Sequence, residues 1–543
     1  KFIIIPLRDN TVRVKFLLRE EEKLLPEFVF VKQYKVPNFK VEKTNTKIFI
    51  KCKEINVIIN RETGKIDFAD PKGNIFLQEK ENSRIVKPNL IDDEELCYFI
   101  EQSFLTFDDE YLFGLGQFQD GHYNIKFITR RLTQVNSQIS IPFIYSSRGY
   151  GLIWHQYGLT DFNPADSFIK LDKLENISNN IDIADVTTTK GTQKILQNQN
   201  LYTGKFDILQ EGEYVFFLDL GNMGNRYFIA IDGNVIIDQS NFWLPPCVST
   251  SPIKLKAGEH KVSIICKSDN KPKLSWRKTD NFITFRSPNA NMLDYIVFYG
   301  PEADRVIASY HILSGNVPML PIWAYGFWQC KERYTSAKQL IETVLEFRNR
   351  DIPIDVIVQD WQYWGENGWG VPKFDRINYP NPESFIKKLH DLNVHFCISI
   401  WSNPDKNSKL GNEFLQKNYY IPESQWLDYF NPEVCKEYWK VLKENMFDYG
   451  VDAWWMDAVE PENDALVGKK TFLGRGEFYR LTYPLMVSKA VYDGQRETTD
   501  RKRVCILTRS SYLGQHRYGT INWSGDINSD WDTYKRQILA GLI

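Results

Sequence analysis

The chain has 543 residues, a length that predicts about two to four domains, each with its own core. Its 67 basic and 69 acidic residues are interspersed and leave a net charge of −2, which argues against a nucleic-acid partner. No apolar run approaches the roughly 20 residues that a membrane-spanning helix needs. Aromatic residues make up 14% of the chain, an excess that indicates either large cores or rings that stack on sugars.

The eight cysteines are scattered, without a CxxC pair or a neighbouring cluster of histidines. Most lie inside apolar runs such as "HFCISIW" and "RVCILT", which favours free thiols in the core over disulfides or a metal site. The HExxH pattern and the phosphate-binding loop pattern are also absent. We therefore predict neither a metal ion nor a cofactor.

The first part of the chain has the pattern of β-structure. Over residues 1–190, short alternating runs are broken by Asp, Asn, Gly and Pro, which predicts a β-sandwich that resumes at 283–315. Residues 191–282 repeat this pattern on a smaller scale, and "IDGNVI" carries an Asp-Gly hairpin signal. We predict a β-module inserted into the sandwich.

From residue 316 to residue 543, strands and amphipathic helices alternate. The predicted strands cover 321–330, 353–360, 394–401, 451–457, 503–509 and 520–526. Repeated βα units predict a (β/α)8 TIM barrel of which about six strands are present, with an open six-stranded sheet as the alternative. Because the sequence stops within the helical pattern "QILAGLI", we expect the natural chain to continue beyond Ile543.

The ends of these strands carry charged and aromatic side chains that could form an active site. In a βα barrel, side chains at the carboxyl ends of the strands point into one mouth. Here those positions hold Asp360, Trp401, Asp457, Arg509 and Asp526. Each alone could cap a helix or neutralise a neighbour, but three carboxylates, a cation and an aromatic ring together predict an active site.

Two carboxylates on either side of a glycosidic bond can hydrolyse it, one as nucleophile or base and the other as acid. We expect Arg509 to keep Asp457 ionised, and the setting after Trp523 and a Ser-Gly turn to let Asp526 hold the proton of a general acid. Double displacement with retained configuration requires the two carboxyl groups to face each other across about 5–6 Å.

Several motifs resemble those of glycoside hydrolase family 31, the retaining α-glucosidases and α-xylosidases. "WWMDAVEPE" resembles the nucleophile motif, "INWSGDINSDW" the acid/base motif and "LTRSSYLGQHRYG" the segment between them. "GLGQFQDGHYN" (114–124) is similar to a loop that the N-terminal sandwich sends toward the active site. The resemblance implies that Asp457 forms a covalent glycosyl ester and that Asp526 acts first as acid and then as base.

The resemblance also assigns the neighbouring residues. It implies that Asp360 binds sugar hydroxyls, that Trp401 and Trp455 wall the sugar, and that Arg509 binds both sugar and nucleophile. Glu460 would brace the nucleophile loop, or it is only a favourable charge in the first turn of a helix. The family's sugar-binding histidine on a late barrel strand would lie beyond the last residue of this sequence.

The inserted module resembles a PA14 domain through "LYTGKF", "EGEYVF" and "IDGNVIID". The acidic pair that often precedes G-x-R in such domains is missing here, where "GNMGNRYF" stands. This absence argues against calcium-dependent sugar binding by that loop, and a spacer or a wall that extends the substrate site is the alternative.

The motif combination resembles α-xylosidases that act on xyloglucan oligosaccharides, which implies exo-acting removal of α-xylosyl residues. Trp361 and Gln362 are candidates for a wall that excludes the hydroxymethyl group of glucose. Such a wall would favour xylose over glucose by about 1–3 kcal/mol. The alternatives are an α-glucosidase or α-transglucosylase, and a non-catalytic carbohydrate-binding protein. Abundant Lys, Asn and Ile indicate a bacterium, which implies a periplasmic or extracellular location with the export signal outside this sequence. A lysosomal or secretory-pathway location is the alternative. The oligomeric state cannot be predicted.

Overall fold

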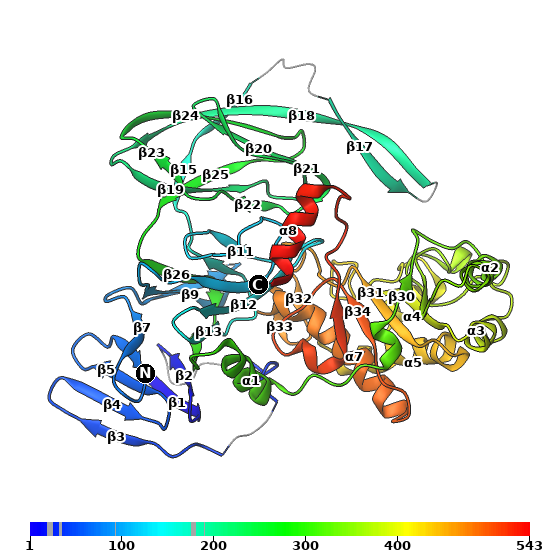
Figure 1. Ribbon diagram of the computed structural model, residues 1–543, viewed down its shortest axis with the longest axis horizontal. Helices are drawn as coiled ribbons and strands as arrows, with labels where there is room; N and C mark the ends of the chain where they lie inside the picture. Colours follow the sequence, from blue (N-terminus) through cyan, green and yellow to red (C-terminus); the bar gives the residue numbers. More distant parts are fainter. Residues whose placement is uncertain (19–24, 32–34, 93, 175–180, 189–190, 543) are drawn as a thin grey trace. The chain divides into compact units, whose positions relative to one another are not determined.

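The computed structural model describes residues 1–18, 25–31, 35–92, 94–174, 181–188 and 191–542 (Figure 1). Contacts within the chain define two compact units. The β-unit comprises Lys1–Pro26, Gln33–Tyr310 and Ser524–Ile543, and the βα-unit comprises Glu27–Lys32 and His311–Trp523. None of the described helices is both long and apolar enough to cross a membrane.

The β-unit contains two antiparallel sheets that form a sandwich. One sheet has the order β1 (Phe2–Arg8), β2 (Thr11–Phe16), β27 (Leu293–Tyr299), β13 (Tyr150–Trp154), β12 (Ile139–Ser146) and β10 (Leu112–Gln117). The other has the order β11 (Arg130–Leu132), β14 (Thr160–Phe162), β26 (Phe282–Ala290), β9 (Glu95–Leu105), β7 (Ile75–Glu79), β6 (Ile66–Ala69), β5 (Asn56–Asn60), β4 (Lys47–Lys51) and β3 (Lys40–Lys43), with β8 (Ile85–Ile91) on β9.

Alternating apolar residues from both sheets fill one core between them. Trp154 of β13 stacks on Phe285 of β26 with ring centroids 5.6 Å apart, and Phe104 of β9 packs edge-on against Tyr295 of β27 at 5.3 Å. All four side chains are fully buried. The predicted sandwich is confirmed, and β26 and β27 close it after the inserted module.

The inserted module is a second pair of antiparallel sheets with its own core around Phe206, Phe216, Ile229 and Ile264. One sheet joins β15 (Ser167–Ile169), β25 (Lys273–Lys278), β19 (Gly212–Asp219), β22 (Cys247–Ser249) and β23 (Ile253–Leu255). The other joins β16 (Leu171–Lys173), β17 (Ile181–Thr188), β18 (Gly191–Ile208), β24 (Gly258–Lys267), β20 (Gly224–Ile231) and β21 (Asn234–Leu244). Its kinship with PA14 domains stays a prediction.

Two details of the module bear on the sequence predictions. The Asp-Gly hairpin joins β20 to β21, and Asp232 and Gly233 both have positive φ, at 49° and 81°, as a two-residue type I′ turn requires. The strands of the module begin at Ser167 rather than at 191, because β15 and β16 pair with β25 and β18. These two strands are too short for their partners to be recognised from sequence.

The βα-unit is built around a parallel sheet with its strands in chain order: β28 (Trp328–Gln329), β29 (Val356–Gln359), β30 (His395–Trp401), β31 (Ala453–Asp457), β34 (Ile506–Thr508) and β35 (Thr520–Asn522). The described residues supply these six strands, so the predicted parallel sheet is confirmed and a full eight-stranded barrel is not. A small hairpin, β32 (Lys470–Thr471) and β33 (Gly474–Arg475), lies between β31 and β34 in the chain.

Helices connect the parallel strands: α2 (Ala337–Asn349), α3 (Pro382–Asp391), α4 (Lys409–Gln416), α5 (Pro432–Asn445), α6 (Gly476–Tyr479) and α7 (Tyr483–Thr498). Helix α1 (Ala303–Ser314) precedes the sheet and α8 (Trp531–Leu542) follows it. The side chains of Ser336, Asn381 and Asn431 accept hydrogen bonds from the first turns of α2, α3 and α5, which fixes where these helices begin.

The strand predicted over 321–330 forms only at Trp328–Gln329, so the prediction is wrong for 321–327. Residues Ile322–Tyr325 form a 3-10 turn after Pro321, which has no N–H to donate. Asp355 Oδ2 then accepts the N–H of Phe327 at 2.8 Å, and the parallel pairing starts with the next residue.

A buried aspartate anchors the start of β31. Asp452 accepts hydrogen bonds from Phe396 N at 2.9 Å and His390 Nε2 at 2.7 Å, and forms an ion pair with Lys502 at 2.7 Å. Burial alone would raise the pKa of Asp452, but the hydrogen bonds from His390 and His395 and the charge of Lys502 hold that pKa well below its ordinary value.

We expect Asp452→Asn to lower the stability of the protein most at neutral pH. A carboxyl group whose pKa is depressed in the folded state contributes stability above its unfolded pKa of about 3.9 and loses it as the pH falls. The stability difference between wild type and variant, measured as urea midpoints from pH 7 to pH 3, should therefore narrow below about pH 4. Asp391→Asn, which removes an exposed partner of Lys387, is the control. A difference that stays constant with pH would contradict this account.

Candidate active site

Four of the predicted site residues lie at one edge of the parallel sheet. Asp360 follows β29, Trp401 ends β30, Asp457 ends β31 and Arg509 follows β34. The register places Trp401 beside Asp457 and, one residue earlier in β31, Met456 beside Thr508. Because parallel strands end at the same edge, residues far apart in the sequence converge here, as the strand pattern predicted.

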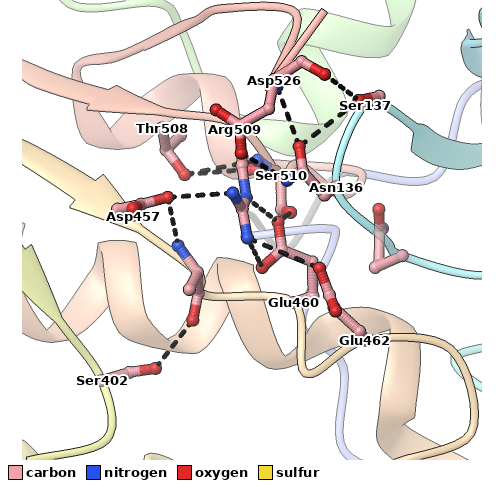
Figure 2. Close-up of polar contacts among 12 residues, drawn as sticks. Asn136, Ser137, Ser402, Asp457, Glu460, Glu462, Thr508, Arg509, Ser510 and Asp526 are labelled. Atoms are coloured by element: carbon pink, nitrogen blue, oxygen red, sulfur yellow. Dashed lines mark hydrogen bonds and ion pairs between the residues drawn. The ribbon is translucent and has the colours of Figure 1, made fainter. Parts of the chain in front are cut away.

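Asp457 forms an ion pair with Arg509, whose Nη1 lies 3.1 Å from Asp457 Oδ1 (Figure 2). The same oxygen accepts the N–H of Ala458 at 2.8 Å. The Asp457 side chain keeps 21% of its surface exposed, so a substrate can reach it. A cation and a backbone N–H both favour the ionised carboxylate that a nucleophile requires.

Glu460 holds Arg509 in place from the other side (Figure 2). The guanidinium donates to both carboxylate oxygens, at 2.8 and 3.3 Å, and Ser510 Oγ donates at 2.6 Å. Glu460 is fully buried and lies outside every described helix, so it is not a charge in a first helical turn. Its role in bracing the nucleophile loop stays a prediction.

The surroundings of Arg509 stabilise its positive charge. Burial alone would lower the pKa of Arg509, but the carboxylates of Glu460 and Asp457 outweigh it and raise that pKa above its ordinary value. Glu462 adds a third carboxylate 3.5 Å from the guanidinium. The cation therefore stays charged at any working pH.

Backbone strain follows both strand-end aspartates. Ala458 has a φ of +48° and Gln362 a φ of +64°, a region that costs a non-glycine residue about 1 kcal/mol or more. Asp360 Oδ1 accepts the N–H of Trp361 at 2.7 Å, as Asp457 does from Ala458. Neither alanine nor glutamine favours this conformation, so this strain could not be predicted from the residue types.

Tryptophans surround this edge. Trp401 is only 3% exposed. Its ring packs edge-on against Trp364 with ring centroids 5.0 Å apart, and its centroid lies 5.8 Å from that of Trp369. Trp369 is 40% exposed and contacts Trp361 at 5.7 Å. Sequence reasoning missed Trp364 and Trp369, although the tryptophan-rich run after Asp360 could have indicated them.

Two further contacts position the tryptophans that lie next to Asp360 and Asp457 in the sequence. Trp361 donates its indole N–H to Glu332 Oε1 at 3.0 Å, a partner that sequence reasoning also missed. Trp455 packs edge-on against Trp523 at 5.3 Å, and its indole Nε1 is buried without a hydrogen-bond partner in the described part of the chain.

Asp526 belongs to the β-unit, because β35 ends at Asn522 and the chain enters that unit at Ser524. Its side chain is exposed, and its role as the general acid stays a prediction. Asn136 donates to Asp526 Oδ2 at 2.6 Å and accepts the N–H of Asp526 at 3.0 Å (Figure 2). Sequence reasoning did not identify Asn136. The separation of Asp526 from Asp457 stays a prediction.

The 114–124 loop contacts the segment that carries Asp526. Gln119 Nε2 donates to the carbonyl of Ser524 at 3.5 Å, and the loop is fixed by Arg130, which binds both carboxylate oxygens of Asp120 at 2.9 and 3.0 Å. That this loop reaches the active site stays a prediction.

Comparison with known proteins connects this geometry to a family. Residues 1–163 match the galactose mutarotase-like N-terminal domain of glycosyl hydrolase 31, and residues 317–543 match the TIM-barrel domain of glycosyl hydrolases family 31. The first match covers strands β1–β14 of the sandwich, and the second covers the parallel sheet and contains both Asp457 and Asp526.

Individual relatives agree with these matches. An alpha-xylosidase of Saccharolobus solfataricus is 30% identical over 556 residues, covering 99% of this chain and 59% of that enzyme. The crystal structure of a GH31 alpha-xylosidase from Xanthomonas citri is 26% identical, with a TM-score of 0.86 over 99% of this chain and 65% of that protein. Alpha-glucosidase 2 of Bacillus thermoamyloliquefaciens is 28% identical over 272 residues, which are 45% of this chain and 34% of that enzyme. The chain thus spans less than two thirds of each relative. The chain belongs to glycoside hydrolase family 31.

Proposed function

We propose that this chain carries the active site of a retaining, exo-acting α-xylosidase that removes non-reducing-end α-xylosyl residues from xyloglucan oligosaccharides. The observation that supports it most is the accessible carboxylate of Asp457, ion-paired with Arg509 at the strand edge while Arg509 is itself locked onto Glu460. Such an arrangement supplies an ionised carboxylate of fixed orientation, as covalent catalysis requires.

The proposed reaction has two displacements. In the first, the Asp457 carboxylate attacks the anomeric carbon while Asp526 gives a proton to the departing glycosidic oxygen, which breaks the glycosidic bond and forms a glycosyl ester. In the second, water attacks the same carbon, Asp526 takes the proton of that water, and the ester bond to Asp457 breaks. Two inversions leave the configuration retained.

The residues around Asp457 suit a sugar ring. We assign sugar hydroxyls to the carboxylate of Asp360 and to the buried indole N–H of Trp455, a donor that has no partner among the described residues. The aromatic cluster around Trp401 offers rings for the apolar faces of the sugar. Trp361, held by Glu332, is the candidate wall against the hydroxymethyl group of glucose.

The name of the Saccharolobus relative and that of the Xanthomonas structure support xylose as the sugar. The Bacillus relative, an alpha-glucosidase, keeps α-glucosidase or α-transglucosylase activity as the second candidate. A location in the bacterial periplasm or outside the cell is part of the proposal, since xyloglucan fragments are met there.

Substrate preference tests this choice. We expect the intact protein to cleave para-nitrophenyl α-xyloside with a kcat/KM about 10 to 200 times that for the α-glucoside, the range that one excluded carbon-sized group supports. Trp361→Ala should reduce this ratio about tenfold by opening the wall. Trp361→Phe keeps a ring there and should preserve most of the preference. Faster cleavage of the glucoside by wild type would overturn the choice of xylose.

A further inference from the structure

A polar hairpin at residues 133–140, held by internal hydrogen bonds, reaches the segment that carries Asp526. Its turn is at Asn136 and Ser137, where Ser137 has a φ of +68° and an antiparallel bridge joins Val135 to Gln138. Two buried glutamines hold its strands together: Gln134 exchanges hydrogen bonds with the backbone of Ser140 at 3.0 and 3.1 Å. Gln138 donates to the carbonyl of Thr133 at 2.8 Å.

The turn of this hairpin holds Asp526 at two points. Asn136 is 1% exposed, and its Oδ1 accepts the backbone N–H of Asp526 at 3.0 Å. Because a backbone N–H can only donate, this bond fixes which end of the amide is oxygen. The Nδ2 group must then face the carboxylate, where it lies 2.6 Å from Asp526 Oδ2.

Gly525 allows this close approach. Its φ is +78°, and an added Cβ would lie 2.5 Å from Ser137 N and 2.6 Å from Asn136 Oδ1. The inserted module supports the same segment from β21, where Asn241 Nδ2 donates to the carbonyl of Asp526 at 3.2 Å and the carbonyl of Ser240 accepts from Asn528 at 2.8 Å. The segment is therefore held on both the sandwich side and the module side.

We propose that Asn136 is a positioning residue for Asp526, and that its amide selects which carboxyl oxygen carries the catalytic proton; this rests on the proposed function. A carboxylic acid has one O–H, and the oxygen that accepts the Asn136 donor is kept as an acceptor. Asp526 Oδ1 is then the oxygen that gives the proton to the leaving group and takes one from water in the second step.

Leaving-group dependence separates this role from a structural one. The leaving oxygen of phenyl α-xyloside needs a proton. The fluoride ion of α-xylosyl fluoride, in contrast, leaves with little acid assistance. Asn136→Asp has the same shape and still accepts the N–H of Asp526, but it cannot donate to the carboxylate and repels it. We expect this variant to lose about 10²-fold in kcat/KM on the phenyl glycoside and about threefold or less on the fluoride. Because kcat/KM reports the first displacement, slow deglycosylation does not obscure the comparison.

The controls make each outcome decisive. Both rates come from one preparation of the intact protein, so an unfolded fraction lowers both equally, and Asn136→Ala serves if Asn136→Asp does not fold. Asn10→Ala, which removes a buried asparagine that bonds Tyr299 and Ser309, should leave the ratio of the two rates unchanged. Asp526→Ala should change the ratio at least as much as Asn136→Asp does.

Two results would count against the proposal. If Asp526→Ala changes the ratio and Asn136→Asp does not, the positioning role is wrong and the proposed function stands. If Asp526→Ala loses rate equally on the two substrates, the positioning role of Asn136 and the proposed function are both wrong. A changed ratio in Asn136→Asp and in Asp526→Ala, with none in Asn10→Ala, supports the assignment.

Discussion

Asp457→Ala is expected to lower kcat/KM on aryl α-xylosides by on the order of 10⁵-fold, the scale on which other covalent enzymes lose activity without their nucleophile. Glu460 cannot replace it, because Glu460 is buried and bonded to Arg509 and Ser510. Asp457→Asn, which keeps the shape, should be nearly as inactive, since an amide cannot form the ester.

The matched control is Asp448→Asn in the same unit. Asp448 is also an ion-paired aspartate, with Lys443 at 2.8 Å, but it lies after α5 and away from the strand edge. We expect it to retain activity within about a factor of two, because exposed ion pairs contribute little. Retention of more than a few per cent of activity in both Asp457 variants would contradict the assigned nucleophile.

Arg509→Met is expected to have the largest effect on stability. It leaves the fully buried Glu460 carboxylate without its cation, and breaking a buried ion pair from one side costs about 3–5 kcal/mol. The midpoint of urea unfolding should fall accordingly, and activity should fall as well because Asp457 loses its ion-pair partner.

A second substitution separates these two effects. Arg509→Met combined with Glu460→Gln removes the stranded charge and should recover most of the lost stability, since apolar or neutral replacements of buried ion pairs are often tolerated. Activity should not return, because Asp457 still lacks its cation. Equal stability of the single and double variants would mean that the Arg509–Glu460 pair contributes little to folding.

The parts of this site that could be predicted are those set by local pattern. Apolar runs of strand length end at Asp360 and Asp457, so periodicity alone placed both at strand ends. The Asp-Gly pair specified the β20–β21 turn, because both of its residues tolerate positive φ. The sandwich and the parallel sheet followed from alternation and from repeated βα units in the same way.

The parts that could not be predicted depend on contacts between distant segments. Asn136 is hydrogen-bonded to Asp526, which lies 390 residues later in the sequence. Nothing in "TQVNSQIS" distinguishes that asparagine from an ordinary turn residue. Glu332 binds Trp361 from the loop after β28, a strand whose predicted length was itself wrong. The strain at Ala458 arises from the surrounding packing, since alanine has no preference for that conformation.

Covalent trapping tests the central claim most directly. The intact protein would be incubated with a 5-fluoro-α-xylosyl fluoride, whose glycosyl ester forms faster than it hydrolyses, then digested and mapped by mass spectrometry. We predict one added fluoroxylosyl group on the peptide that contains "WWMDAVEPE", attached at Asp457, and no label in Asp457→Asn. A label on another residue, or undiminished labelling of Asp457→Asn, would show that this carboxylate is not the nucleophile.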